Sequence, residues 1–91
     1  MEEIVTLNCL TLGECGEVVE VRANDGMRRR FTDLGLIRGT QVTCLAVSPL
    51  GGLSAYRIRG AVIAIRHRDS NGITLRRLWN HNNEESNTPS R

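Results

Sequence analysis

The stretch DLGLIRGT, residues 33–40, places two glycines four positions apart, between a helical pattern and a strand pattern. Gly35 stands where a helix stop requires a positive φ, and Leu36 can contact the last helical turn as in a Schellman motif. Residues 37–40 fit a type II turn in which Gly39 supplies the positive φ at the third position. The stretch therefore predicts a tight corner at which a helix folds back over a sheet, and a structural role for both glycines.

A short helix leads into this corner. Asn24 or Asp25 can serve as its N-cap, because either side chain can accept a hydrogen bond from the first helical N–H groups. The apolar positions form one stripe toward the core: Met27, Phe31 and Leu34. The outward positions are polar: Arg28, Arg29 and Thr32.

Five segments have the composition of short strands. They are residues 17–23, 40–48, 53–60, 61–66 and 73–78. In the first segment, alternation puts Val19, Val21 and Ala23 on one face. Residues 6–16 are expected to form an ordered lead-in that places leucines in the core, and residues 67–72 a single helical turn or loop.

The third strand segment alternates strictly, with Tyr56 and Ile58 inward and Arg57 and Arg59 outward. Five short strands, with one short helix after the first, indicate a mainly β fold and a small closed barrel, which removes exposed strand edges. Residues 80–91 are polar and offer no apolar anchor, so we expect a disordered tail after a folded domain of residues 1–79.

The charges are segregated along the chain. Residues 1–20 contain five glutamates and no arginine, whereas residues 22–77 contain eleven arginines against three aspartates, and the chain has no lysine. The planar fork of arginine suits carboxylates, phosphates and protein surfaces. Two interpretations stay open: the arginines form a binding surface, or they reflect composition alone and are solvated.

Length, N-terminal residues and cysteine content indicate a small cytoplasmic domain. Ninety-one residues form one domain at most. The chain begins MEEIV, acidic where a signal peptide is basic, and its longest apolar run, residues 61–65, is far too short to span a bilayer. Three cysteines without paired spacing do not describe a disulfide framework.

No pattern in the chain indicates catalysis or a metal site. The side chains that could supply soft ligands are Cys9, Cys15, Cys44 and His67. Their spacing is not that of a metal site, and His81 lies in the polar tail. Cys44 has no histidine or acid near it in sequence, and PLGG is too short for a phosphate-binding loop. We therefore expect no enzyme activity, no cofactor and no stoichiometric metal.

Three longer stretches resemble the FeoA family of ferrous-iron transport accessory proteins. RRRFTDLGLIRGTQVTCL (28–45) is similar to the basic helix, Leu-Gly-Leu, Gly-Thr and strand of that family. SPLGGLSAYRIRGAVIAIRHRDSNGITL (48–75) continues with its Pro-x-Gly, strand, Arg-Gly and further strands. LNCLTLGECGEVVEV (7–21) resembles the family's start. The chain departs where the family often has proline, at Arg38, and where a small residue is common, at Asn71.

The resemblance covers residues 6–76 and implies an SH3-like barrel in the cytoplasm, at the inner membrane only through its partner. It implies a role in supporting or regulating FeoB, the membrane GTPase permease for ferrous iron, and a family-level association with transition metal ions. Nucleic-acid binding and insertion into the membrane are not expected. Whether the chain associates weakly with itself stays open.

Two classes of function fit the residues. One is a protein-binding module for the permease; the other is a regulatory or nucleic-acid-binding barrel like the C-terminal domain of iron-dependent repressors. Nucleic-acid barrels need stacking aromatics on an open face, and alternation turns Tyr56 inward, which favours the first class. The expected contact surface is an apolar anchor ringed by arginines. Its residues are Arg28, Arg29, Leu50, Leu53, Arg57 and Arg59.

Overall fold

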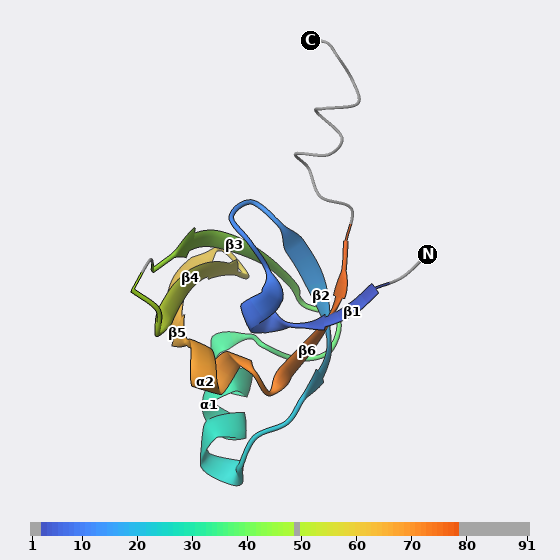
Figure 1. Cartoon of the computed structure of the whole chain (residues 1–91). Helices are drawn as coiled ribbons and strands as arrows, with labels where there is room; N and C mark the ends of the chain where they lie inside the picture. Colours follow the sequence, from blue (N-terminus) through green and yellow to red (C-terminus); the bar gives the residue numbers. More distant parts are fainter. Residues whose placement is uncertain (1–2, 49, 79–91) are drawn as a thin grey trace, which may run out of the picture.

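A computed structural model describes residues 3–48 and 50–78, in which six antiparallel strands form one curled sheet (Figure 1). The strands are β1 (Glu3–Thr6), β2 (Cys15–Val21), β3 (Gln41–Val47), β4 (Leu53–Ile58), β5 (Ala61–Arg66) and β6 (Ile73–Arg77). The helical segments are η1 (Leu7–Cys9), α1 (Asp25–Leu34) and α2 (His67–Ser70). The strand order is β1-β6-β2-β3-β4-β5, so β1 and β5 form the two edges.

The mainly β, SH3-like class is confirmed, but two details of the prediction were wrong. β1 overlaps the expected lead-in only at Thr6, and it pairs with β6. The described residues therefore contain six strands, and α1 follows the second strand rather than the first. The sheet is also not closed, since no ladder among the described residues joins β5 to β1. Helical segments bridge this gap instead: α2 contacts η1, and the Tyr56 hydroxyl donates a 3.4 Å hydrogen bond to the Leu7 carbonyl.

β2 corrects the predicted face of the first strand segment. The strand begins at Cys15, and its register against β6 shifts between Val18 and Glu20, as in a β-bulge. Val18 is therefore fully packed in the core, whereas Val19 is only half-buried. Alternation in the sequence could not predict these two positions, because the extra residue of a bulge turns all the residues after it to the opposite face of the strand.

The corner after α1 has the expected backbone. Gly35 has φ 98°, its N–H donates to the Thr32 carbonyl at 3.0 Å, and the N–H of Leu36 donates to the Phe31 carbonyl at 2.8 Å. These are the two hydrogen bonds of a Schellman motif. Gly39 has φ 94°, and residues 37 and 40 are joined by the 3.0 Å hydrogen bond of a β-turn.

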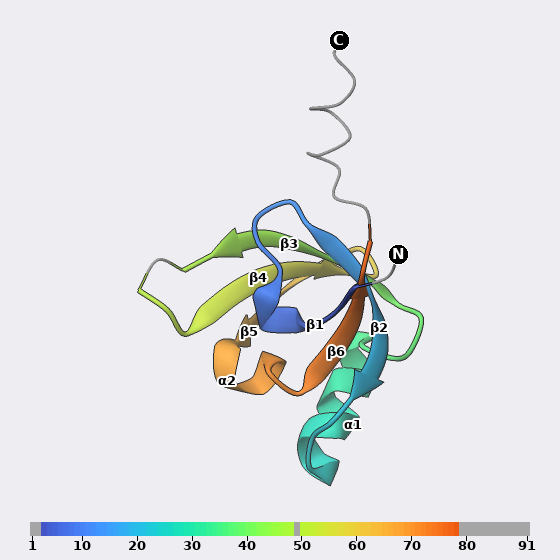
Figure 2. The same cartoon turned by 45° about the vertical axis from the view of Figure 1, so that its right-hand side comes forward.

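α1 starts with an N-cap at Asn24, whose side chain accepts a 2.9 Å hydrogen bond from the Met27 N–H. The helix covers one end of the curled sheet in both views (Figures 1 and 2). It contributes Phe31 to a core completed mainly by the strands. The other core residues are Leu7, Leu10, Val18, Leu36, Val42, Cys44, Tyr56, Ile58, Ile65, Ile73 and Leu75.

The structure tests the prediction for the start of the chain but not the one for its end. The lead-in buries Leu7 and Leu10 as expected, but Leu12 is exposed. The expected tail, residues 80–91, lies outside the described residues. No helix in the part of the chain that the structure describes is long and apolar enough to cross a membrane.

Candidate functional site

The acidic leader and the arginines of β6 are partners in space. Arg77 forms ion pairs with Glu14 at 3.1 Å and with Glu3 at 3.5 Å. Arg76 pairs with Glu17 on the neighbouring strand. The charge segregation seen along the sequence is thus partly neutralised by the β1–β6–β2 pairing, which places these two arginines beside glutamates.

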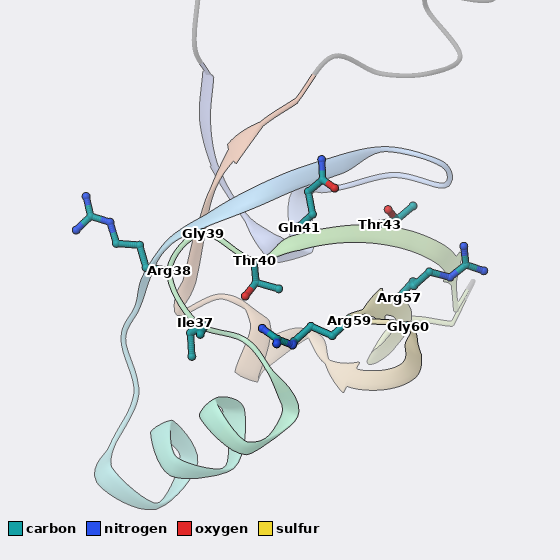
Figure 3. A pocket seen from close by; sticks show the side chains of 9 residues that line it. All are labelled: Ile37, Arg38, Gly39, Thr40, Gln41, Thr43, Arg57, Arg59 and Gly60. Atoms are coloured by element: carbon teal, nitrogen blue, oxygen red, sulfur yellow. The ribbon is translucent and has the colours of Figure 1, made fainter.

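A second group of arginines gathers at the end of the molecule where α1 turns into β3. Arg38, Arg57 and Arg59 line a hollow of about 500 Å³, which we call the arginine basin (Figure 3). The other lining residues are uncharged: Ile37, Gly39, Thr40, Gln41, Thr43 and Gly60. None of these three arginines belongs to an ion pair between described residues.

Chain reversal and strand pairing bring the basin together. The turn at Gly39 carries Arg38 to the start of β3, and Thr43 of β3 lies opposite Arg57 of β4. β4 and β5 are joined by the two-residue turn Arg59–Gly60. The basin therefore combines segments about twenty residues apart that meet only in the folded sheet.

Arg59 has an unusual backbone conformation. Its φ is 53°, the only positive φ of a non-glycine among the described residues, and Gly60 follows with φ 86°. Two positive φ values define a type I′ turn, whose first position favours Asn, Asp or Gly. An arginine there has a conformational cost of about 1 kcal/mol.

The side chains of the basin are splayed. In Figure 3 the guanidinium of Arg59 points toward Thr40, whereas Arg38 and Arg57 point outward from the rim. Arg59 also lies over the C-terminal end of α1, where a cation is favoured by the unpaired carbonyls of the helix. Three guanidinium groups around an open hollow suit carboxylates or phosphates carried by another molecule.

The structure divides the six residues predicted to form one contact surface. Arg57 and Arg59 line the basin, while Leu50 and Leu53 lie at the β3–β4 loop. Leu53 begins β4 and Arg59 directly follows its last residue, so the two lie about 20 Å apart along an extended strand. Figure 2 shows the β3–β4 loop and the corner after α1 on opposite sides of the molecule. Leu50 is nonetheless almost fully exposed (97%), and Leu53 is half-exposed.

Arg28 and Arg29 lie in the first half of α1, about 10 Å along the helix axis from the corner at Gly35. Arg28 donates a 3.3 Å hydrogen bond to the Val21 carbonyl, and Arg29 is exposed. These two arginines are therefore not brought to the basin. The residue that sequence reasoning missed is Arg38, whose place in the turn after Gly35 was its only signal.

The thiols show no arrangement for chemistry. Burial raises the pKa of the Cys44 and Cys15 thiols above the ordinary value of 9.0, with the Glu14 carboxylate adding to the effect, so both stay protonated at neutral pH. No group of three or more His, Cys, Asp or Glu side chains among the described residues could hold a metal ion. The expectation of no stoichiometric metal stays a prediction.

One serine–histidine pair also went unnoticed in the sequence. Ser54 Oγ lies 2.8 Å from His67 Nε2 and is 4% exposed as a residue. The pair joins the start of β4 to the start of α2, next to the 2.8 Å hydrogen bond from the His67 N–H to the Gly52 carbonyl. We assign it a structural role in fixing α2 across the open side of the sheet.

Known proteins share the fold of this chain. FeoA of Chlorobium tepidum has a TM-score of 0.78 and 35% identity, over 82% of this chain and 71% of its own. FeoA of Stenotrophomonas maltophilia, solved with zinc and described as an SH3 domain protein, has a TM-score of 0.69 and 27% identity, over 78% and 88%. No curated protein matches the chain.

A manganese-dependent transcriptional repressor has the same fold in part of its chain. Its TM-score is 0.76 over 86% of this chain and 44% of its own, at 20% identity, which shows a common fold alone. The FeoA domain, in contrast, matches as a family over residues 5–77. This match spans most of the sequence and includes the corner, the basin and all strands but the start of β1, so the chain belongs to the FeoA family.

Proposed function

We propose that this protein is a non-enzymatic binding module at the cytoplasmic side of the membrane, which supports ferrous iron uptake by docking on a FeoB-type permease. Family membership supports the pathway: the relative from S. maltophilia is described as a candidate activating factor of bacterial ferrous iron transport. The partner surface would be an acidic patch on the GTPase part of the permease.

The arginine basin is the observation that carries the proposal. Its three guanidinium groups have no carboxylate among the lining residues, in contrast to Arg76 and Arg77, which are paired with glutamates. Arginine is also enriched at protein interfaces, where charged side chains steer the encounter of two partners. Docking rather than catalysis fits the open shape of the hollow.

A regulatory barrel that binds nucleic acid has weaker support. The repressor relative shares only the fold. Single-stranded nucleic acids are held by exposed aromatic rings, and the aromatic residues that the structure describes, Phe31 and Tyr56, are 3% and 0% exposed. Salt-dependent retention on single-stranded DNA would be the result that favours this alternative.

The test is a pull-down against the isolated GTPase domain of the permease, with and without nucleotide. The proposal expects the wild-type protein to be retained, and retention to fall when Arg57 and Arg59 are both changed to alanine. Loss of retention with an equal change at Arg28 and Arg29 instead would place the contact on another face. No retention under any nucleotide condition would contradict the proposed function.

A further inference from the structure

β5 is an edge strand without the usual protection. It is last in the strand order, and no strand among the described residues pairs with its outer side. Its first five residues, AVIAI, contain no charge and no proline, which are the features that natural edges use to prevent pairing. The edge is therefore competent to pair with another extended chain.

The register shows which backbone groups are free. The turn at residues 59–60 closes on the pair Ile58 and Ala61, so β5 bonds to β4 through its odd-numbered residues. Val62 and Ala64 then direct their N–H and C=O groups away from β4. Neither residue makes a backbone hydrogen bond outside the β4 ladder within the described chain.

A groove runs beside this edge. It has a volume of about 420 Å³ and separates β5 from α1. Its apolar lining comes from α1, β5 and the first residue of β4: Met27, Phe31, Leu34, Leu53, Ile63, Ala64 and Ile65. The charged residues around it are three arginines and one aspartate: Arg30, Arg66, Arg68 and Asp69. The groove is thus apolar inside and basic at its rim.

We propose that the β5 edge and this groove bind an extended segment of a partner protein, which pairs with β5 as an added strand. Apolar side chains at alternate positions of that segment pack against α1, and a carboxylate at its end meets the arginines of the rim. A second copy of this chain fits less well, because it would bring the same arginines to the groove. The inference goes beyond the proposed function, since it holds for any partner with such a segment.

The test uses a synthetic heptapeptide, EVTVTVE, blocked at both ends, with EVTPTVE as the control that cannot form a continuous strand. Main-chain bonding tolerates many sequences, so an alternating apolar peptide is a fair probe. In an NMR titration we expect saturable shifts and slower amide exchange at Val62 and Ala64 with EVTVTVE alone. Failure to saturate, or shifts confined to other elements, would overturn the proposal.

Two variants examine the edge and the rim separately. Ala64→Pro removes one outward N–H and keeps the β4 ladder, so it should fold and lower the affinity about tenfold. Asp25→Pro, at the first position of α1, is the proline control and should bind as the wild type does. Arg30→Glu with Arg68→Glu should lower the affinity for EVTVTVE and raise the affinity for KVTVTVK, in which lysines replace the two glutamates.

Equal affinity of Ala64→Pro and wild type would overturn pairing at this edge, and unchanged peptide preference in the double variant would overturn the role of the rim. The peptide assay does not contain the permease. Its failure would leave the proposed function standing, and failure of the permease pull-down would leave this inference standing.

Discussion

The side chain of Arg59 lies across Gly35, so the turn between β4 and β5 is packed on the end of α1. A Cβ on Gly35 would clash with Cδ of Arg59 and come within 3.1 Å of its Cγ. Gly35 is thus required twice, by its φ of 98° and by the arginine above it. Gly39 has nearly the same φ, but a Cβ there would meet nothing closer than Glu17 Oε2 at 4.0 Å.

These two glycines form a matched pair for mutation. Gly39→Ala should lower the free energy of unfolding by about 1–2 kcal/mol, because alanine is strained at positive φ. Gly35→Ala should cost more, since Arg59 must also move, and Gly35→Val should cost several kcal/mol. Urea denaturation measures these differences. Equal losses of unfolding free energy in the two alanine variants, or a Gly35→Val protein as stable as its parent, would show that the contact with Arg59 does not affect stability.

Arg59→Asn should separate stability from binding. Asparagine suits the first position of a type I′ turn, so the variant should gain about 0.5–1 kcal/mol in free energy of unfolding. The same change removes a guanidinium from the basin and should weaken binding to the permease. Denaturation and pull-down on one preparation test both effects. A variant that binds as well as the wild type would remove Arg59 from the docking surface.

Local chemistry made the corner predictable, whereas long-range pairing did not follow from the sequence. Helix end, glycine stop and turn lie within residues 33–40, and each has its own local signal. β1 pairs with β6 some seventy residues away, and EIVT runs straight into η1 without turn residues that would mark its end. The bulge at Val18 and Glu20 is set by pairing with β6, which alternation cannot reveal.

Only part of the candidate site could be predicted, because it too depends on long-range strand pairing. Alternation along β4 showed that Arg57 and Arg59 point outward. Their meeting with Arg38 depends on the pairing of β3 with β4, and the separation of Leu53 from the basin depends on the length of β4. Closeness in sequence was therefore a poor guide to which outward residues share a surface.

Stability should fall at alkaline pH for an identifiable reason. Burial raises the pKa of the Tyr56 hydroxyl and the Cys44 thiol above their ordinary values of 10.0 and 9.0. Above pH 9 the unfolded chain loses these protons while the folded chain keeps them, so the free energy of unfolding decreases as pH rises. Each group contributes at most about 1.4 kcal/mol per pH unit.

The sequence contains no lysine, so few other side chains titrate in this range. Cys44→Ala should flatten the decline in thermal stability above pH 9, measured under reducing conditions. Cys9→Ala, at an exposed position, is the control for the loss of one cysteine. A Cys44→Ala protein with the same slope as the wild type would contradict the burial argument.

Truncation tests the limits of the folded domain. The family match ends at residue 77, and NHNNEESNTPSR, residues 80–91, contains no apolar anchor. A chain ending at Asn80 should therefore melt within error of the full chain. A large fall in melting temperature would show that this segment docks on the sheet and that the domain extends beyond residue 79.

Surface plasmon resonance against the immobilised GTPase domain of the permease shows whether the protein docks through the arginine basin. Arg57→Ala with Arg59→Ala should lower the association rate about tenfold and flatten its salt dependence, because the basin steers the encounter. Arg28→Ala with Arg29→Ala makes the same change in charge at the other end of α1 and should keep the wild-type rate. Overlaid traces for the basin variant and the wild type, or equal losses in both double variants, would contradict docking through the basin.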